Sequence, residues 1–416
     1  MIQFNLLLKA YLAIFILRSV AEITLSGLNL FHLRRHRSDI PEAFKGMVDQ
    51  EQFEKIVNYS LDSNRFGIFV VLVNEAVFLA LLLSGFLPWL EKIIHGWGWS
   101  SIVNGLVFFG VLSLLANLLR IPLSLYGTFV IEDRYGFNTM TIKTWVLDLV
   151  KSLILFTILG GSLLWLLFSL VTYGGKTWWL GAWLLVSGYE LLLLWLFPVV
   201  IAPLFNKFEP IEDKTLEDRI RMLMERVGLQ IKGVFKMDAS KRSKHTNAFF
   251  AGIGKTKRIV LFDTLLQSHP EEEVLAVLAH EVGHWKRKHV LKQIVLVEIL
   301  SLVVFYGVGR FMDWPLLYQT FGFQVPTVYT GLFLIATLLS PLSYFLQPLG
   351  AAISRAFERE ADNFSSELMK TPEPLCQSLR RLAADNLENL NPHPLYAWFY
   401  YSHPPLIERI MRLQNR

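Results

Sequence analysis

Long apolar blocks separated by polar segments dominate this chain. Seven of the blocks have roughly 20 or more predominantly apolar residues, which is the length needed to cross the hydrocarbon core of a bilayer. They are approximately Asn5–Phe31, Phe66–Leu90, Ile102–Tyr126, Trp145–Val171, Trp178–Ile201, Val290–Phe311 and Pro326–Ala351. The pattern predicts an all-α polytopic membrane protein with seven transmembrane helices.

Positive charge is unevenly distributed between the polar segments, and this predicts an orientation. The segments that follow the first, third, fifth and seventh spans carry most of the lysine and arginine; they are Leu33–Arg65, Gly127–Thr144, Pro203–His289 and Glu358–Arg416. The other three connections are short and nearly free of both residues. By the positive-inside rule the charged side is cytoplasmic, so the N-terminus faces out and the C-terminus faces in.

The chain divides into four regions on this basis. Residues 1–202 hold spans one to five, 203–289 form a hydrophilic domain, 290–351 hold spans six and seven, and 352–416 complete the hydrophilic domain. Within the second region, Lys214–Val227 has helical periodicity. Three short apolar runs predict strands, the last two joined by a turn at Gly252–Gly254; they are Gly233–Met237, Asn247–Ala251 and Arg258–Phe262. We therefore expect a small α/β domain on the cytoplasmic face.

The composition is typical of a membrane protein and excludes folds that depend on several cysteines. The chain of 416 residues is 53% hydrophobic and 18% charged, with a mean hydropathy of +0.40. Its single cysteine, Cys376, excludes an internal disulfide and any cysteine-based zinc finger. The formal charge of +5 fits basic cytoplasmic loops, so no nucleic-acid partner is expected.

One motif carries clear chemistry. His280-Glu281-Val282-Gly283-His284 lies on a predicted helix that starts at Ser268–Pro270, followed by three glutamates. Histidines at i and i+4 project from one helix face and can converge on one zinc ion. Glu281 sits one residue round, where it can act as the base for an attacking water. A chance match is the alternative, but the preceding apolar run provides the helical context that the motif requires.

A catalytic zinc site needs a third protein ligand and an open position. The segment Ser354–Asp362 follows the seventh span and offers Glu358 and Glu360, with Asp362 on the same helix face as Glu358. Spacing does not choose between the two glutamates, and a solvated charged helix is the alternative. His289 follows at the wrong distance for the extended metzincin motif. Because spans six and seven form a hairpin, both segments should meet at the cytoplasmic membrane surface.

Several further segments make the chain resemble the CAAX prenyl protease 1 family of integral-membrane zinc endopeptidases. The matching segments run from the third span to the end, in family order, and include the two zinc-site segments above. The others are Thr128–Glu132, Tyr135–Asn138, Pro203–Phe208, Asn247–Phe250, Arg258–Asp263 and Tyr401–Pro405. Together these segments are far more specific than the HExxH motif alone.

The resemblance assigns roles to individual residues. It makes Glu358 the third metal ligand, Asp362 a carboxylate behind the ligands, and His403 the stabiliser of the developing oxyanion, with Arg409 near the same site. It also makes Asn247, Ala248 and Phe249 an edge strand that pairs with an extended peptide. From the residues alone, an exposed loop histidine is the favoured interpretation of His403, and an ordinary hairpin strand fits Asn247–Ala251 as well.

The family resemblance also implies a substrate and a chamber. Family members cleave isoprenylated proteins after the modified cysteine and enclose a hollow between seven helices. Ionisable residues within the predicted spans fit a hydrated chamber or paired structural charges; they are Glu75, Arg120, Asp148, Lys151 and Glu190. We expect one zinc ion per chain, peptide or protein substrates, and lipid as the surrounding medium.

The chain ends without retrieval lysines, so a bacterial inner membrane is expected, or the endoplasmic reticulum in a eukaryote. In a bacterium the role would be membrane-protein quality control. The alternatives are a site-2-type intramembrane protease, whose Leu-Asp-Gly motif is absent from this sequence, and a transporter or scaffold with an incidental metal site.

Overall fold

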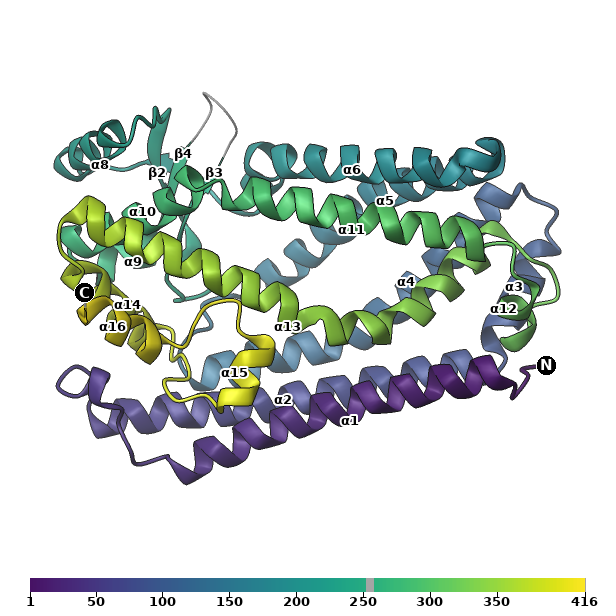
Figure 1. Ribbon diagram of the computed structural model, residues 1–416, viewed down its shortest axis with the longest axis horizontal. Helices are drawn as coiled ribbons and strands as arrows, with labels where there is room; N and C mark the ends of the chain where they lie inside the picture. The colour runs from purple at the N-terminus through teal and green to yellow at the C-terminus, as the bar shows by residue number, and fades with distance from the viewer. Residues whose placement is uncertain (252–257, 416) are drawn as a thin grey trace.

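Long helices build most of the molecule. The computed structural model describes residues 1–251 and 258–415. The longest helices are α1 (Leu6–Arg35), α2 (Gln50–Leu83), α4 (Ser101–Tyr126), α5 (Ile142–Tyr173), α6 (Trp178–Leu196), α11 (His289–Phe311) and α13 (Val328–Met369). They run along the long axis of the molecule, with the N-terminus at one end and the C-terminal helices at the other (Figure 1).

Shorter elements connect and cap the long helices. The short α-helices are α3 (Phe86–His95), α7 (Ala202–Phe205), α8 (Lys214–Arg226), α9 (Asp263–Ser268), α10 (Glu271–Lys286), α12 (Pro315–Thr320), α14 (Glu373–Asp385), α15 (Pro394–Tyr400) and α16 (Leu406–Gln414). Two segments of π-helix, η2 (Gly127–Glu132) and η4 (Phe197–Ile201), extend α4 and α6. Three 3₁₀ turns complete the helical elements: η1 (Glu42–Phe44), η3 (Gly175–Thr177) and η5 (Ala239–Lys241).

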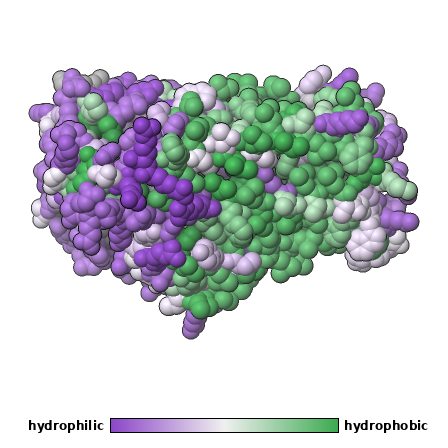
Figure 2. All heavy atoms as spheres, turned by 90° about the horizontal axis from the view of Figure 1, so that it is seen from below, coloured by the Kyte–Doolittle hydropathy of each residue, from purple (hydrophilic) through white to green (hydrophobic). Residues whose placement is uncertain are grey.

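The outer surface is that of a multi-pass membrane protein. Among the described residues, six helices are long and apolar enough to cross a bilayer: Gln50–Leu83, Ser101–Glu132, Ile142–Tyr173, Gly175–Phe205, His289–Phe311 and Val328–Met369. Figure 2 shows a broad apolar band beside a strongly polar end. The predicted membrane fold class is confirmed, but the count of seven spans is not, since α1 is outside this set. Helix α1 carries Arg18, which pairs with Glu22 and with Glu75 of α2.

Two of the predicted helix boundaries are wrong. The predicted span Phe66–Leu90 is interrupted, because α2 ends at Leu83 and α3 starts at Phe86. Gly85 between them has φ +80°, a left-handed conformation that glycine adopts without steric cost. Ser268, predicted to start the HExxH helix, instead ends α9, and α10 begins after Pro270.

The small α/β domain lies at the polar end. Its four-stranded sheet has the order β1-β2-β4-β3, with β1 (Phe208–Pro210) antiparallel to β2 (Gly233–Met237). Strand β4 (Arg258–Phe262) runs parallel to β2 and antiparallel to β3 (Ala248–Ala251). The three predicted strands are confirmed to within one residue, and β3 is at an edge of the sheet. The predicted turn at Gly252–Gly254 lies outside the described residues.

A single apolar core joins this sheet to the HExxH helix. The alternate residues Ile259 and Leu261 of β4 are fully buried, and they pack with the apolar faces of α8 and α10. Leu278 and Val282 supply the α10 side of this core and are also fully buried. The helix therefore has one face fixed in the core, which leaves its opposite face for the polar site.

Cavities lie between the membrane helices. One of about 400 Å³ is lined by Arg120 and Asp148, and another of about 360 Å³ by Glu22 and Tyr400. Asp148 also pairs with Arg242 of the α/β domain, at 2.7 Å from Nε. The ionisable residues inside the bundle thus include both paired charges and residues that line cavities.

Candidate metal centre

Helices α10 and α13 cross closely at the site. Gly283, inside the HExxH motif, lies against α13: a Cβ built there would be 3.0 Å from the Cα of Ala361 and 3.2 Å from the Cβ of Phe364. The Ser365 hydroxyl donates to the carbonyl of Ala276 at 2.8 Å, which fixes the two helices at a second point. The glycine permits the approach that brings the polar faces of both helices together.

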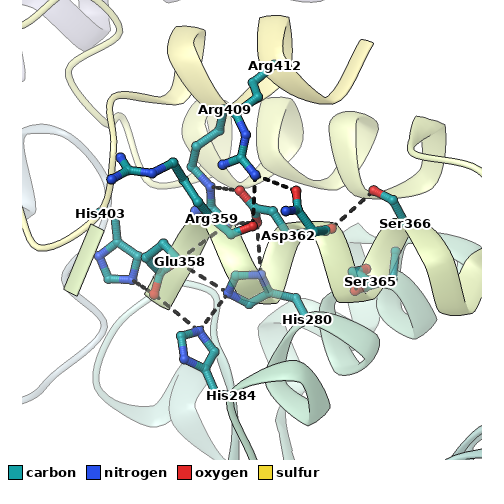
Figure 3. A network of polar contacts seen from close by, with 12 residues as sticks. His280, His284, Glu358, Arg359, Asp362, Ser365, Ser366, His403, Arg409 and Arg412 are labelled. Carbon is teal, nitrogen blue, oxygen red and sulfur yellow. Dashed lines mark hydrogen bonds and ion pairs between the residues drawn. The ribbon is translucent and has the colours of Figure 1, made fainter. Parts of the chain in front are cut away.

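Three side chains from these helices converge at the crossing (Figure 3). His280 and His284 come from α10 and Glu358 from α13, and one donor atom of each lies within 4.8 Å of the others. The two Nε2 atoms are 3.2 Å apart. Glu358 places Oε2 3.3 Å from His280 Nε2 and Oε1 3.2 Å from His284 Nε2. This is the two-imidazole, one-carboxylate donor set of catalytic zinc sites.

One of the donor atoms is a buried carboxylate oxygen that a cation would stabilise. Glu358 is 6% exposed, and its buried Oε2 accepts no hydrogen bond among the described residues, although it has ion-pair contacts with His280 and Arg409. A buried carboxylate oxygen without a hydrogen-bond partner is costly. His280 is equally enclosed, with 7% of its surface exposed. The residues present therefore fit a bound metal ion.

A buried ion pair lies directly behind His280. Asp362 Oδ1 is 2.9 Å from His280 Nδ1. The same carboxylate accepts two hydrogen bonds from Arg409, at 2.6 Å from Nη2 and 3.0 Å from Nε. Arg409 Nη2 is also 3.6 Å from Glu358 Oε2. Burial opposes the charged form of His280, but the carboxylates of Asp362 and Glu358 outweigh it and raise its pKa to about 9.

Glu281 lies next to the cluster without contributing a donor atom to it. Its carboxylate has enough protein around it that burial raises its pKa, while the nearby charge of His280 opposes the shift. A carboxylate with a raised pKa is a better proton acceptor at neutral pH than an exposed one. Glu281 thus lies beside the donors and outside their set.

His403 approaches the same carboxylate from the C-terminal segment. Its Nε2 is 3.3 Å from Glu358 Oε1, and its Nδ1 is 3.0 Å from the Ser402 hydroxyl. Protein around the ring lowers the pKa of His403 through desolvation, although 61% of the side chain is reached by solvent. His403 is therefore part of the site.

The two candidate glutamates are separated by the structure. Glu358 lies in the donor cluster, whereas Glu360 points away and has its Oε2 3.1 Å from His289 Nε2. Sequence reasoning considered His289 only as a metal ligand and missed this contact. The available signal was the short distance of His289 from the motif, five residues after His284.

The edge strand divides its side chains between two environments. Ala248 is 5% exposed and packs in the core under the sheet, while Phe249 packs on the opposite face against Val260. Asn247 is exposed, and its Oδ1 accepts a hydrogen bond from the backbone N–H of Ala248 at 2.8 Å. The described part of β3 pairs only with β4. Along its other edge, β3 pairs with no strand of the described residues.

A second polar network anchors the segment before β3, and sequence reasoning missed it. His245 has Nε2 3.2 Å from Glu132 Oε2 and Nδ1 3.2 Å from Asn386 Oδ1. Tyr59 of α2 donates to the other oxygen of Glu132 at 2.7 Å, and Asn386 Oδ1 accepts from the Thr246 N–H at 3.0 Å. Glu132 belongs to the Thr128–Glu132 segment that carried the family resemblance, which was the available signal. The network ties β3 to the membrane helices.

Comparisons with known proteins cover most of the chain. The family described as "CAAX prenyl protease N-terminal, five membrane helices" matches residues 29–207, and "Peptidase family M48" matches residues 210–416. The CAAX prenyl protease 1 homolog of Arabidopsis thaliana is 36% identical, over 90% of each chain. CAAX prenyl protease 1 of Saccharomyces cerevisiae is 35% identical, over 90% of this chain and 88% of its own. A crystal structure of S. mikatae Ste24p matches with a TM-score of 0.88 at 32% identity, over 95% of this chain and 98% of that chain.

Proposed function

Because the chain belongs to the CAAX prenyl protease 1 family of membrane metalloendopeptidases, we propose that it cleaves proteins carrying an isoprenylated cysteine near their C-terminus. Cleavage would follow the modified cysteine and release the last three residues. The observation that carries this proposal is the convergence of His280, His284 and Glu358 at the end of the membrane bundle. The donor set of a hydrolytic zinc site is thus joined to a membrane helix, because Glu358 lies on α13.

We propose zinc as the metal, held by His280 and His284 through Nε2 and by a carboxylate oxygen of Glu358. Two imidazoles and one carboxylate suit this ion, and three protein ligands leave a position open. When bound, zinc supplies a Lewis acid that polarises the scissile carbonyl and acidifies water. Asp362 and Arg409 act behind the ligands. Asp362 orients the His280 ring, and Arg409 neutralises the Asp362 carboxylate.

The remaining steps belong to side chains around the metal ligands. Glu281 accepts the proton of the attacking water and returns it to the leaving amine, as its position and raised pKa allow. His403 donates a hydrogen bond to the oxyanion that forms at the scissile carbonyl. The edge of β3 away from β4 holds the peptide in extended form, with Asn247, Ala248 and Phe249 as the pairing segment. Ala248 would contribute only backbone groups, since its side chain packs in the core, whereas the Phe249 side chain is partly buried against Val260.

His403→Ala should lower kcat for peptide hydrolysis by about 10²- to 10³-fold, the typical cost of removing one oxyanion donor. Bound metal should remain, because His403 is outside the three-residue donor set. Steady-state kinetics together with metal analysis measures both quantities. His403→Gln keeps an N–H donor and should retain more activity than the alanine variant. An unchanged kcat in His403→Ala would remove His403 from the mechanism.

The orientation of the site follows from charge. The basic loops and the α/β domain lie at the same end of the bundle, opposite the N-terminus (Figure 1). On the positive-inside rule we propose that this end, with the metal centre, faces the cytoplasm. The host membrane, a bacterial inner membrane or the endoplasmic reticulum, stays a prediction.

The substrate proposal is tested with a matched pair of peptides that end in the same CAAX sequence, one farnesylated on cysteine and one unmodified. We expect kcat/KM to be at least about tenfold higher for the farnesylated peptide. Burial of only two methylene groups, at ~0.8 kcal/mol each, is enough for that factor. Mass spectrometry should identify the released tripeptide.

Two results would argue against prenyl specificity. Equal cleavage of both peptides indicates a general protease, consistent with membrane-protein quality control. Cleavage at a bond other than the one after cysteine contradicts the proposed reaction. The alternative of a site-2-type protease is disfavoured because the HExxH motif lies on α10, outside the six apolar helices.

A further inference from the structure

A buried histidine lies directly behind one of the proposed metal ligands and is unused by the mechanism above. His289 is the first residue of α11 and is 1% exposed. Its Nδ1 is 3.1 Å from Nδ1 of His284. The other ring nitrogen of His284 faces the donor cluster. His289 therefore contacts the ligand on the side away from the metal position.

The hydrogen bonds around His289 form a chain with one consistent direction. If Nε2 of His284 is to bind a cation, the proton of its neutral ring must be on Nδ1. His284 then donates to His289, whose Nδ1 must be an unprotonated acceptor. The proton of His289 is consequently on Nε2, which is 3.1 Å from Glu360 Oε2. A carboxylate accepts that hydrogen bond, so the three groups are satisfied together.

Local structure holds the His289 ring in this position. Lys288 has φ +57°, a left-handed conformation uncommon for a lysine, and it separates α10 from α11. This turn lets His289 fold back towards His284, only five residues earlier. The ring of His289 stacks on Phe357 of α13, with centroids 4.2 Å apart and planes 7° apart. Glu360 comes from the same helix, so α13 supplies both the stacking surface and the terminal acceptor.

The two histidine ligands would then be supported differently. His280 is backed by Asp362, a carboxylate that is itself paired with Arg409. His284 is backed by a neutral imidazole, and the carboxylate of Glu360 lies one group further out. Glu360 is also far more exposed, at 46% of its side chain against 2% for Asp362.

We propose that His289 and Glu360 are positioning residues that fix the tautomer and ring orientation of His284 for metal binding. This inference rests on the proposed function, because it takes His284 as a ligand. Residues that orient metal ligands typically contribute about 10- to 100-fold to metal affinity. His289 contacts His284 on the side away from the donor cluster, and Glu360 contacts His289, so their effect should appear in metal binding before it appears in hydrolysis.

The test measures the dissociation constant of zinc by competition with a chelating indicator, on purified full-length protein in detergent. His289→Phe keeps a ring on Phe357 but removes the acceptor, and should weaken zinc binding by about 10- to 100-fold. His289→Asn places an amide oxygen near the position of Nδ1, and should stay within about threefold of wild type. Glu360→Ala changes a partly exposed residue and should cause an intermediate loss.

Thermal unfolding of the metal-free variants separates positioning from folding. The exposed His95 in α3, at the opposite end of the bundle, provides a matched control, and His95→Phe should bind zinc as wild type does. Unchanged zinc affinity in both His289→Phe and Glu360→Ala overturns the proposal. Equal losses in His289→Phe and His289→Asn, with lowered unfolding temperatures, also overturn it in favour of a packing role. The readout of this test is zinc affinity. Wild-type protein that binds zinc but cleaves no peptide would therefore refute the proposed function and leave the positioning role of His289 and Glu360 standing.

Discussion

Glu281→Gln should reduce the rate of peptide hydrolysis by about 10²- to 10⁴-fold, the usual contribution of a positioned general base. The amide has nearly the shape of the carboxylate but cannot accept the proton of the attacking water. Bound metal should be retained, because Glu281 supplies no atom to the cluster of His280, His284 and Glu358. Single-turnover hydrolysis of a farnesylated peptide, with metal content measured on the same sample, gives both values.

A matched control comes from the same helix. Glu272 lies in the first turn of α10, is 58% exposed and pairs with Arg219. Glu272→Gln makes the same chemical change away from the donors and should leave the rate within about twofold, because an exposed ion pair contributes little. If Glu281→Gln hydrolyses peptide as fast as this control does, Glu281 is not the base. A transporter or scaffold role with an incidental metal site would then be favoured.

Glu358→Gln should remove most of the bound metal and the activity that depends on it. The substitution eliminates the only negative charge among the three donors and leaves a weaker amide oxygen in its place. We expect zinc affinity to fall by more than about 100-fold, which is the upper range for losing a residue that merely orients a ligand. Zinc content after dialysis, together with peptide hydrolysis, measures the effect.

Glu360, the other candidate for the third ligand, provides a control for this prediction. Glu360 is two residues further along α13 and points to His289 instead of the cluster. Glu360→Gln keeps an oxygen that can accept from His289, so zinc should remain bound at one ion per chain. If Glu360→Gln loses the metal and Glu358→Gln retains it, the assignment of the third ligand is reversed.

Much of the fold was predictable because membrane insertion leaves a simple pattern. Apolar stretches long enough to span a bilayer must be helical, since the backbone has no water to bond with in the hydrocarbon core. The strands β2 and β4 were likewise predicted at their observed bounds, from short apolar runs between turn residues. What failed were local boundaries, such as the break at Gly85, where one backbone conformation overrides continuous hydropathy.

Part of the site was predictable for a similar reason. His280 and His284 are one helical turn apart, so the sequence alone places both imidazoles on one face of α10. The position of Glu281 beside them follows from the same helix geometry. These predictions needed no knowledge of the rest of the fold, because the residues are close in sequence.

The remaining parts of the site were decided only by tertiary structure. Only the family resemblance favoured Glu358; spacing could not choose between Glu358 and Glu360, because their order along the chain does not fix the rotation of α13 against α10. Packing at Gly283 sets that rotation, and it turns Glu358 to the cluster and Glu360 to His289. Contacts between residues distant in sequence depend on how helices pack, and that information is spread over whole interfaces instead of residing in any one motif.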